Sequence, residues 1–153
     1  MLFLVFQLDA ERYAIEAATV AAVLPRVQLR RLPQAHDAVA GVFDYRGEVV
    51  PVIDLCRLAL ARPAREAMST RIVLADYADR AGNARRLGLL AERVVDTVRL
   101  QAEAFAPSGV EQPAARYLGP VARDAHGLLQ RIGVRELLPD DVHDLLFQQA
   151  AQA

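Results

Sequence analysis

The sequence predicts an all-β protein that forms a barrel or a sandwich and ends in one amphipathic helix. Short apolar runs of strand length recur along the chain, separated by turn signals. The segment 41–55 is the clearest example, because it contains two strands joined by a tight polar turn. After Pro139 the character changes, and apolar residues recur at helical spacing. These observations favour short antiparallel strands over alternating strands and helices.

Composition limits both the domain count and the class of partner. A chain of 153 residues fits one domain, or two small lobes that share a core, and 54% hydrophobic residues suffice for a packed interior. The net charge of −1 gives no electrostatic reason to expect nucleic acid or anionic lipid as a partner. Residues 1–8 are too short for a membrane helix, and the single cysteine excludes an internal disulfide, so we expect a cytoplasmic protein.

The first elements are strands, with one ambiguous segment. Residues 3–8 form an apolar strand and residues 13–15 its return. Between residues 17 and 24 the valines have helical spacing, and Pro25 ends the segment. Residues 27–30 then alternate as a strand does. We therefore expect a helical turn that runs into a strand.

The hairpin at residues 41–55 has a specific turn. Its tip, Tyr45-Arg46-Gly47-Glu48, contains a glycine that we expect to take a positive φ. The second strand is too apolar to face water on either side. Pro51 lies in that strand and has no N–H to donate, which favours a sheet edge or a bulge.

The second half continues the β pattern before the terminal helix. Residues 61–70 and 102–116 are expected to be irregular. Strands are expected at residues 71–77, 87–100 (one long or two short), 118–122 and 128–132. The helix after Pro139 begins with two aspartates in its first turn, where negative charge suits the helix dipole. Its residues at helical spacing are Val142, Leu145, Leu146 and Gln149.

No constellation indicates catalysis, a metal or a cofactor. The three histidines are isolated, and no pair has the spacing of a helical metal site. Cys56 follows an apolar strand and is best interpreted as a small core residue rather than a nucleophile. Asp54 is interpreted as a hydrogen-bonded strand terminus, because the alternating pattern and acidic cluster of a phosphoacceptor fold are missing. We therefore expect neither enzymatic activity nor a bound cofactor.

The hairpin closely resembles the signature of the CheW family, adaptors that couple chemoreceptors to the histidine kinase CheA. The family form is a Gly-Val-x-Asn-Leu-Arg-Gly turn followed by a Val-Pro-Val-Ile-Asp-Leu strand. This chain departs from it at Asp44 and Tyr45. The matching residues are Gly41, Val42, Arg46, Gly47, Pro51, Val52, Ile53, Asp54 and Leu55.

The likeness extends over roughly residues 3–138. The hairpin that begins at Phe3 is similar to the family's first hairpin. Residues 88–94 resemble its Gly-Leu-x-Val-Asp-x-Val strand, with Ala91 and Glu92 in place of Val and Asp. The resemblance implies two small five-stranded SH3-like barrels packed side by side, with the first strand paired into the C-terminal lobe.

This resemblance also implies domain boundaries. The CheW-like domain would span residues 1–138, followed by a helical tail at 139–153. Its N-terminal lobe would cover about residues 14–80, and its C-terminal lobe residues 1–13 with 81–138.

In function, the resemblance implies a non-catalytic adaptor with two partners. A methyl-accepting chemoreceptor would dock its cytoplasmic tip in a groove between the lobes, and the regulatory domain of a CheA-type kinase would pair with the N-terminal lobe. The expected groove residues are Leu4, Ala17, Val20, Val23 and Val94. The expected kinase surface comprises Val27, Leu29, Arg46, Gly47 and Glu48. The Asp44-Tyr45 variant and the helical tail hint at an accessory, Wsp-like or pilus-type system.

Two alternatives remain open from the residues alone. One is a stand-alone barrel that recognises a peptide by strand addition, unrelated to chemoreceptors. The other is a small hydrolase or ligand-carrying barrel, which would need a polar pocket with a perturbed acid.

Overall fold

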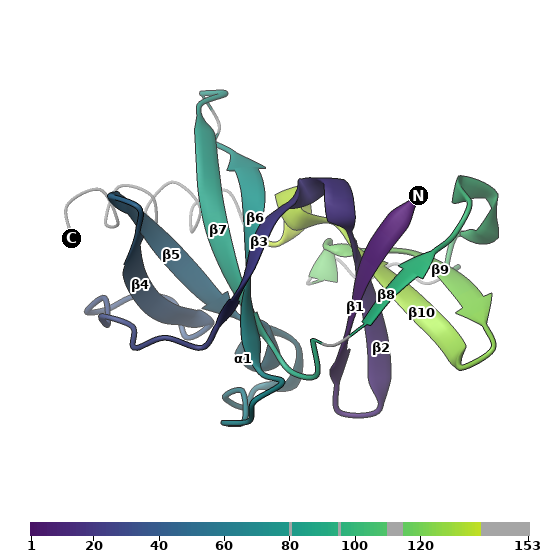
Figure 1. Ribbon diagram of the computed structural model, residues 1–153, viewed down its shortest axis with the longest axis horizontal. Coiled ribbons are helices and arrows are strands. Elements are labelled where there is room, and N and C mark those ends of the chain that lie inside the picture. Colours follow the sequence, from purple (N-terminus) through teal and green to yellow (C-terminus); the bar gives the residue numbers. More distant parts are fainter. Residues whose placement is uncertain (80, 95, 110–114, 139–153) are drawn as a thin grey trace.

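Two lobes stand side by side, each built on one β-sheet (Figure 1). The computed structural model describes residues 1–79, 81–94, 96–109 and 115–138. Within these residues there are two five-stranded sheets, which confirms the predicted all-β class and the two lobes. The N-terminal lobe has the strand order β3 (Val20–Pro25), β6 (Arg71–Ala78), β7 (Ala84–Ala91), β5 (Glu48–Asp54) and β4 (Val39–Tyr45). The C-terminal lobe has the order β8 (Asp96–Arg99), β1 (Leu2–Leu8), β2 (Glu11–Glu16), β10 (Gly127–Ile132) and β9 (Leu118–Asp124).

Each sheet is closed by one short backbone bridge between its two edges. In the N-terminal lobe the chain that follows edge strand β3 reaches the opposite edge, where Arg30 and Val42 exchange two backbone hydrogen bonds of 2.8 Å. In the C-terminal lobe the chain that follows β8 does the same, and Ala106 and Val121 exchange bonds of 2.8 and 2.9 Å. Each bridge satisfies backbone groups of an edge strand and turns an open sheet into a barrel.

The lobes also share one strand arrangement. Each joins two antiparallel hairpins through a parallel pair, β5 with β7 in one lobe and β2 with β10 in the other. The N-terminal lobe uses a continuous run from residue 20 to residue 91, whereas the C-terminal lobe takes β1 and β2 from ahead of that run. The expected boundaries near residues 14 and 80 therefore need correction. Strand β7 lies beyond residue 80, but it pairs with β5 and β6 and its second half is buried, so it belongs to the N-terminal lobe.

One core cluster spans both lobes. It joins Phe6, Leu8 and Ile15 of the C-terminal lobe to side chains of the N-terminal lobe such as Val73 and Leu89. Each lobe adds a smaller apolar cluster of its own. The lobes are thus fixed to one another by apolar packing as well as by the chain.

A short helix, α1 (Leu55–Leu60), follows β5 and was not expected from the sequence. The Asp54 carboxylate caps it by accepting the N–H groups of Cys56 at 2.9 Å and Arg57 at 3.3 Å. Ala61 ends the helix in the left-handed region, at φ 56°. Asp54 is thus a hydrogen-bonded strand terminus, as predicted, and Cys56 is a buried core residue.

Three local expectations need correction. The helical turn is confined to a 3-10 turn at Ala17–Thr19, and the valines after it belong to strand β3, in which a bulge between Val20 and Ala22 shifts the pattern. The strand expected at residues 27–30 is reduced to a single bridge at Arg30. Pro51 lies in an interior strand rather than at an edge, because β5 pairs with both β4 and β7. The segment 87–100 forms two strands, one of the two options left open.

Two further 3-10 turns, Ala102–Ala104 and Val134–Glu136, complete the described elements. The helix expected after Pro139 lies outside the described residues. Among the helices that are described, none is long and apolar enough to cross a bilayer.

Candidate functional site

The tip of the β4–β5 hairpin is a rigid, exposed turn. Arg46 and Gly47 both have positive φ, 52° and 85°. The Asp44 carboxylate accepts the Gly47 N–H at 2.9 Å, which fixes the turn from one side. The Arg46 guanidinium lies over the Tyr45 ring, 5.2 Å from its centroid. The predicted positive φ at Gly47 is confirmed, and the family's usual Asn is replaced here by an aspartate that still caps the turn.

A second arginine that the sequence did not single out joins this tip. Arg86 of β7 lies 5.6 Å from the Tyr45 centroid and 3.7 Å from the Glu48 carboxylate. The Phe43 ring lies edge-on to Tyr45, with centroids 6.4 Å apart. The tyrosine that replaces the family's leucine therefore provides a ring for two guanidinium groups, which leucine could not do. We call Tyr45, Arg46, Glu48 and Arg86 the hairpin-tip patch.

The other two residues expected on the kinase surface differ in exposure. Val27 is 39% exposed. Leu29 is partly buried and packs on the small core of the N-terminal lobe, around Val52 and Ile72. Leu29 therefore supports the lobe rather than presenting an apolar side chain to a partner.

Three of the expected groove residues lie where the two lobes meet. Leu4 and Val20 are partly buried and both pack on the core cluster that spans the lobes. Ala17 opens the 3-10 turn, which contacts β1. The structure thus brings β1, this turn and the start of β3 together where the two lobes meet.

The remaining two groove candidates behave differently. Val23 is 38% exposed and lies further along β3, beyond the bulge. Val94 is 2% exposed, and its N–H donates to the Ser69 carbonyl at 3.0 Å. Val94 is therefore a core residue and does not line an exposed groove.

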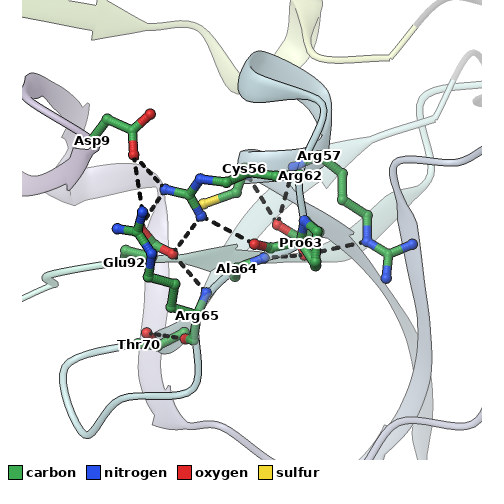
Figure 2. Close-up of polar contacts among 10 residues, drawn as sticks. Asp9, Cys56, Arg57, Arg62, Pro63, Ala64, Arg65, Thr70 and Glu92 are labelled. Carbon is green, nitrogen blue, oxygen red and sulfur yellow. Dashed lines mark hydrogen bonds and ion pairs between the residues drawn. The ribbon is translucent and has the colours of Figure 1, made fainter.

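An ionic network at the seam between the lobes was missed by sequence reasoning. Figure 2 shows the Arg62 guanidinium between Asp9 of the C-terminal lobe and Glu92 of the segment that links the lobes. It donates to the Glu92 carboxylate at 2.9 and 3.0 Å and to Asp9 at 2.6 Å. In addition, the backbone carbonyl of Glu92 accepts the Gln7 N–H at 3.1 Å. One guanidinium thus connects both lobes to their linker.

Two buried carboxylates fix the loop that carries Arg62. Asp54 accepts the N–H of Ala64 at 2.9 Å, and Glu92 accepts the N–H of the next residue, Arg65, at 2.6 Å. The loop after α1 is therefore held at consecutive amides from two directions (Figure 2). The sequence feature that could have indicated this network is Glu92, which occupies a position where the family usually has aspartate.

The electrostatics of the seam are those of a structural network. The hydrogen bonds from Arg62 lower the pKa of Glu92 to about 2, despite the opposing effect of burial. The same contacts raise the pKa of Arg62 above its ordinary value. Burial raises the pKa of the Cys56 thiol to about 12, and the charges of Glu92 and Asp54 add to the shift. Glu92 is thus held ionised and Cys56 neutral, the opposite of what an acid–base or thiolate catalyst needs.

Comparisons with known proteins agree with this architecture. Residues 2–141 match the family model described as a CheW-like domain. The Chemotaxis protein CheW of Klebsiella aerogenes is 26% identical over 144 residues, which cover 94% of this chain and 80% of that protein. The Chemotaxis protein CheW of Bacillus subtilis is 27% identical over 138 residues, 88% of this chain and 85% of that one.

A solved structure shows the same fold. The scaffolding protein TtCheW from Thermoanaerobacter tengcongensis superposes with a TM-score of 0.79 at 20% sequence identity, covering 90% of this chain and 87% of that one. A family match across nearly the whole chain, together with the two closed lobes and the Arg-Gly hairpin tip, establishes the relationship. This chain belongs to the CheW-like family, whose members are non-catalytic scaffold or adaptor proteins.

Proposed function

We propose that this chain is the coupling adaptor of a chemosensory complex, binding a methyl-accepting chemoreceptor and a CheA-type histidine kinase. The proposal places the protein in the cytoplasm, where it reaches membrane receptor arrays only through its partners. The observation that carries it is the presence of two different surfaces on one two-lobed domain. These are a partly buried apolar junction of the lobes at Leu4, Ala17 and Val20, and the exposed hairpin-tip patch.

The apolar junction suits the tip of a helical hairpin. Leu4 and Val20 already rest on the shared core, so a partner that covers them removes the remaining apolar surface from water at little cost in side-chain freedom. Because the junction is formed by both lobes, a helix bound there would favour one relative orientation of the lobes over others. That is the property a coupling protein needs to pass a receptor change to a kinase.

The hairpin-tip patch suits a protein partner with polar groups. Two guanidinium groups lie over one tyrosine ring, and a carboxylate lies beside them. Arginine and tyrosine are enriched at the centres of protein interfaces, and the turn is already ordered before binding. We assign the kinase to this patch. The Tyr45 variant is expected to alter which kinase or pathway the adaptor serves.

Neither rival function gains support. Strand addition needs a sheet edge with free backbone groups, whereas in each lobe part of an edge strand is already hydrogen-bonded in the closing bridge. A hydrolase needs an acid with a pKa near neutrality, whereas Arg62 holds the buried Glu92 at about 2.

The test is co-purification of the chain with a receptor cytoplasmic fragment and with a CheA-type kinase from the same cells. Arg46→Ala should reduce kinase capture and leave receptor capture unchanged, while Ala17→Asp, in a turn without buried residues, should reduce receptor capture only. Arg99→Ala is the matched control, because Arg99 is an exposed arginine on β8 of the other lobe. Failure of the unmodified chain to bind either partner would refute the proposal.

A further inference from the structure

A cavity of about 420 Å³ opens at the seam between the lobes, beside the ionic network. Its lining comes from three places in the fold. Gln7 belongs to β1 of the C-terminal lobe, Arg65 and Ser69 to the loop after α1, and Arg93 to the segment that links the lobes. The cavity is therefore lined by both lobes and by the segment that links them, and it shares no residue with the apolar junction or the hairpin-tip patch.

The charges around this cavity do not balance. Two arginines, Arg65 and Arg93, line it against one carboxylate, Glu92. The carboxylates of Asp9 and Glu92 are engaged by Arg62, and Arg65 also lies 3.7 Å from Asp9. Among the described residues, none forms an ion pair with Arg93. In the part of the chain that the structure describes, Arg93 is thus a lining cation without an ion-pair partner.

The backbone of Arg93 is also unusual. Its φ is 51°, in the left-handed region where a residue with a side chain is disfavoured by about 1 kcal/mol or more. A glycine would adopt this conformation without strain. Strained residues of this kind concentrate at binding sites, where the surrounding structure maintains them. A charged residue that lines a cavity with a strained backbone, and that has no ion-pair partner among the described residues, is a reason to look for a ligand.

We propose that the seam cavity is a binding site for a carboxylate. The guanidinium groups of Arg93 and Arg65 supply the charge and paired N–H donors, and a planar carboxylate matches that fork. Among the described residues, neither the Ser69 hydroxyl nor the Gln7 side-chain amide makes a hydrogen bond, so both can donate to the same ligand. The carboxylate comes either from a small organic acid or from an acidic side chain of a bound protein.

A singly charged ligand fits better than a phosphate dianion. The unpaired charge amounts to one arginine, and Glu92 lies in the wall of the cavity with its own negative charge. A second negative charge on the ligand would therefore face Glu92 without a compensating cation. Because Gln7 and Arg65 belong to different lobes, a carboxylate between them would also restrain the lobes relative to each other.

The experiment is an NMR titration of the full chain, labelled with ¹⁵N, at constant ionic strength set with chloride. Sodium acetate is the small-acid probe, a blocked Gly-Glu-Gly peptide with one carboxylate is the side-chain probe, and inorganic phosphate is the comparison. The expected result is a saturable shift of the backbone amides of Gln7, Ser69 and Arg93, with phosphate at least threefold weaker. Saturation by acetate alone assigns the site to small acids, and tighter binding of the peptide assigns it to a protein partner.

Two variants make the test decisive. Arg93→Gly removes the guanidinium and relieves the positive φ, so it should keep or raise the melting temperature while weakening the probe at least tenfold. Arg99→Gln is the control, since it removes an exposed arginine of β8 and should leave the titration unchanged. Shifts that do not saturate, or that persist unchanged in Arg93→Gly, would overturn the proposal.

Discussion

Arg62 and Glu92 face each other across the seam of the two lobes and form a two-point ion pair, with N–O distances of 2.9 and 3.0 Å. Glu92 is only 6% exposed, so its charge depends on this partner. Arg62 also reaches Asp9 on the far side of the seam. The pair therefore fixes the orientation of the lobes as well as the loop that follows α1.

Replacing Arg62 with alanine should destabilise the protein by about 3 kcal/mol, because it leaves a buried carboxylate unpaired. That value is at the low end for a buried pair, since Arg62 is itself 25% exposed. Urea unfolding measures the loss. The control is Arg26→Ala, which breaks an exposed ion pair to Glu66 and should cost less than about 1 kcal/mol. Equal unfolding midpoints for the two variants would contradict the structural role of the network.

The stability should fall in acid through the same residue. The pKa of Glu92 is about 2 in the folded protein and 4.5 in its ordinary state, so the folded state binds the proton more weakly. The contribution of Glu92 to the free energy of unfolding is complete above about pH 4.5 and is lost as the pH falls toward 2. Unfolding free energies measured across this range, for the unmodified chain and for Glu92→Gln, check the prediction. The unfolding free energy of the variant should depend less steeply on pH. Parallel curves of unfolding free energy against pH would show that Glu92 does not contribute to the acid sensitivity.

The two valines of β3 should respond differently to a negative charge. Val20 packs on the core that spans the lobes, so Val20→Asp buries part of an unpaired carboxylate and should cost about 3 kcal/mol or more. Val23 is well exposed, so Val23→Asp should change the stability by less than about 1 kcal/mol. Thermal melting of both variants distinguishes them. Similar losses would mean that β3 is not seated as the structure places it.

Two glycines of the signature hairpin should differ in what they tolerate. A Cβ on Gly47 meets no atom within 4 Å, so Gly47→Ala incurs only the strain of its positive φ, about 1 kcal/mol. A Cβ on Gly41 would lie 2.5 Å from the Arg30 carbonyl oxygen. Gly41→Ala should therefore cost more, about 2–3 kcal/mol, by opening the bridge that closes the barrel. Chemical denaturation gives both values, and a smaller loss for Gly41→Ala would contradict this role.

The sequence indicated those parts of the fold whose signals are local. The hairpin with Gly47 was predictable because its turn residues and its apolar strand adjoin each other. Helix α1 was not, because its six residues are too few to show a helical period, and Asp54, which caps it, was interpreted only as the end of a strand. Strand β3 resembled a helix because a bulge at Ala21 shifts the alternation that identifies a strand.

The candidate sites were less predictable than the fold. The motif located Arg46 and Gly47 at an exposed tip, but Arg86 reaches that tip from a strand that is distant in sequence. Arg62 and Glu92 are thirty residues apart and carry no shared local pattern. Contacts of this kind depend on how the strands pair, which periodicity along the chain does not specify.

The order of strands along the chain has a consequence for synthesis on the ribosome. The N-terminal lobe is one continuous run, so it can close as soon as β7 has emerged. The hairpin of β1 and β2 emerges before it, yet the strands that flank that hairpin, β8 and β10, are translated after it. The apolar residues of the hairpin must therefore stay exposed, or in temporary contact with the finished lobe, until β8 and β10 have emerged.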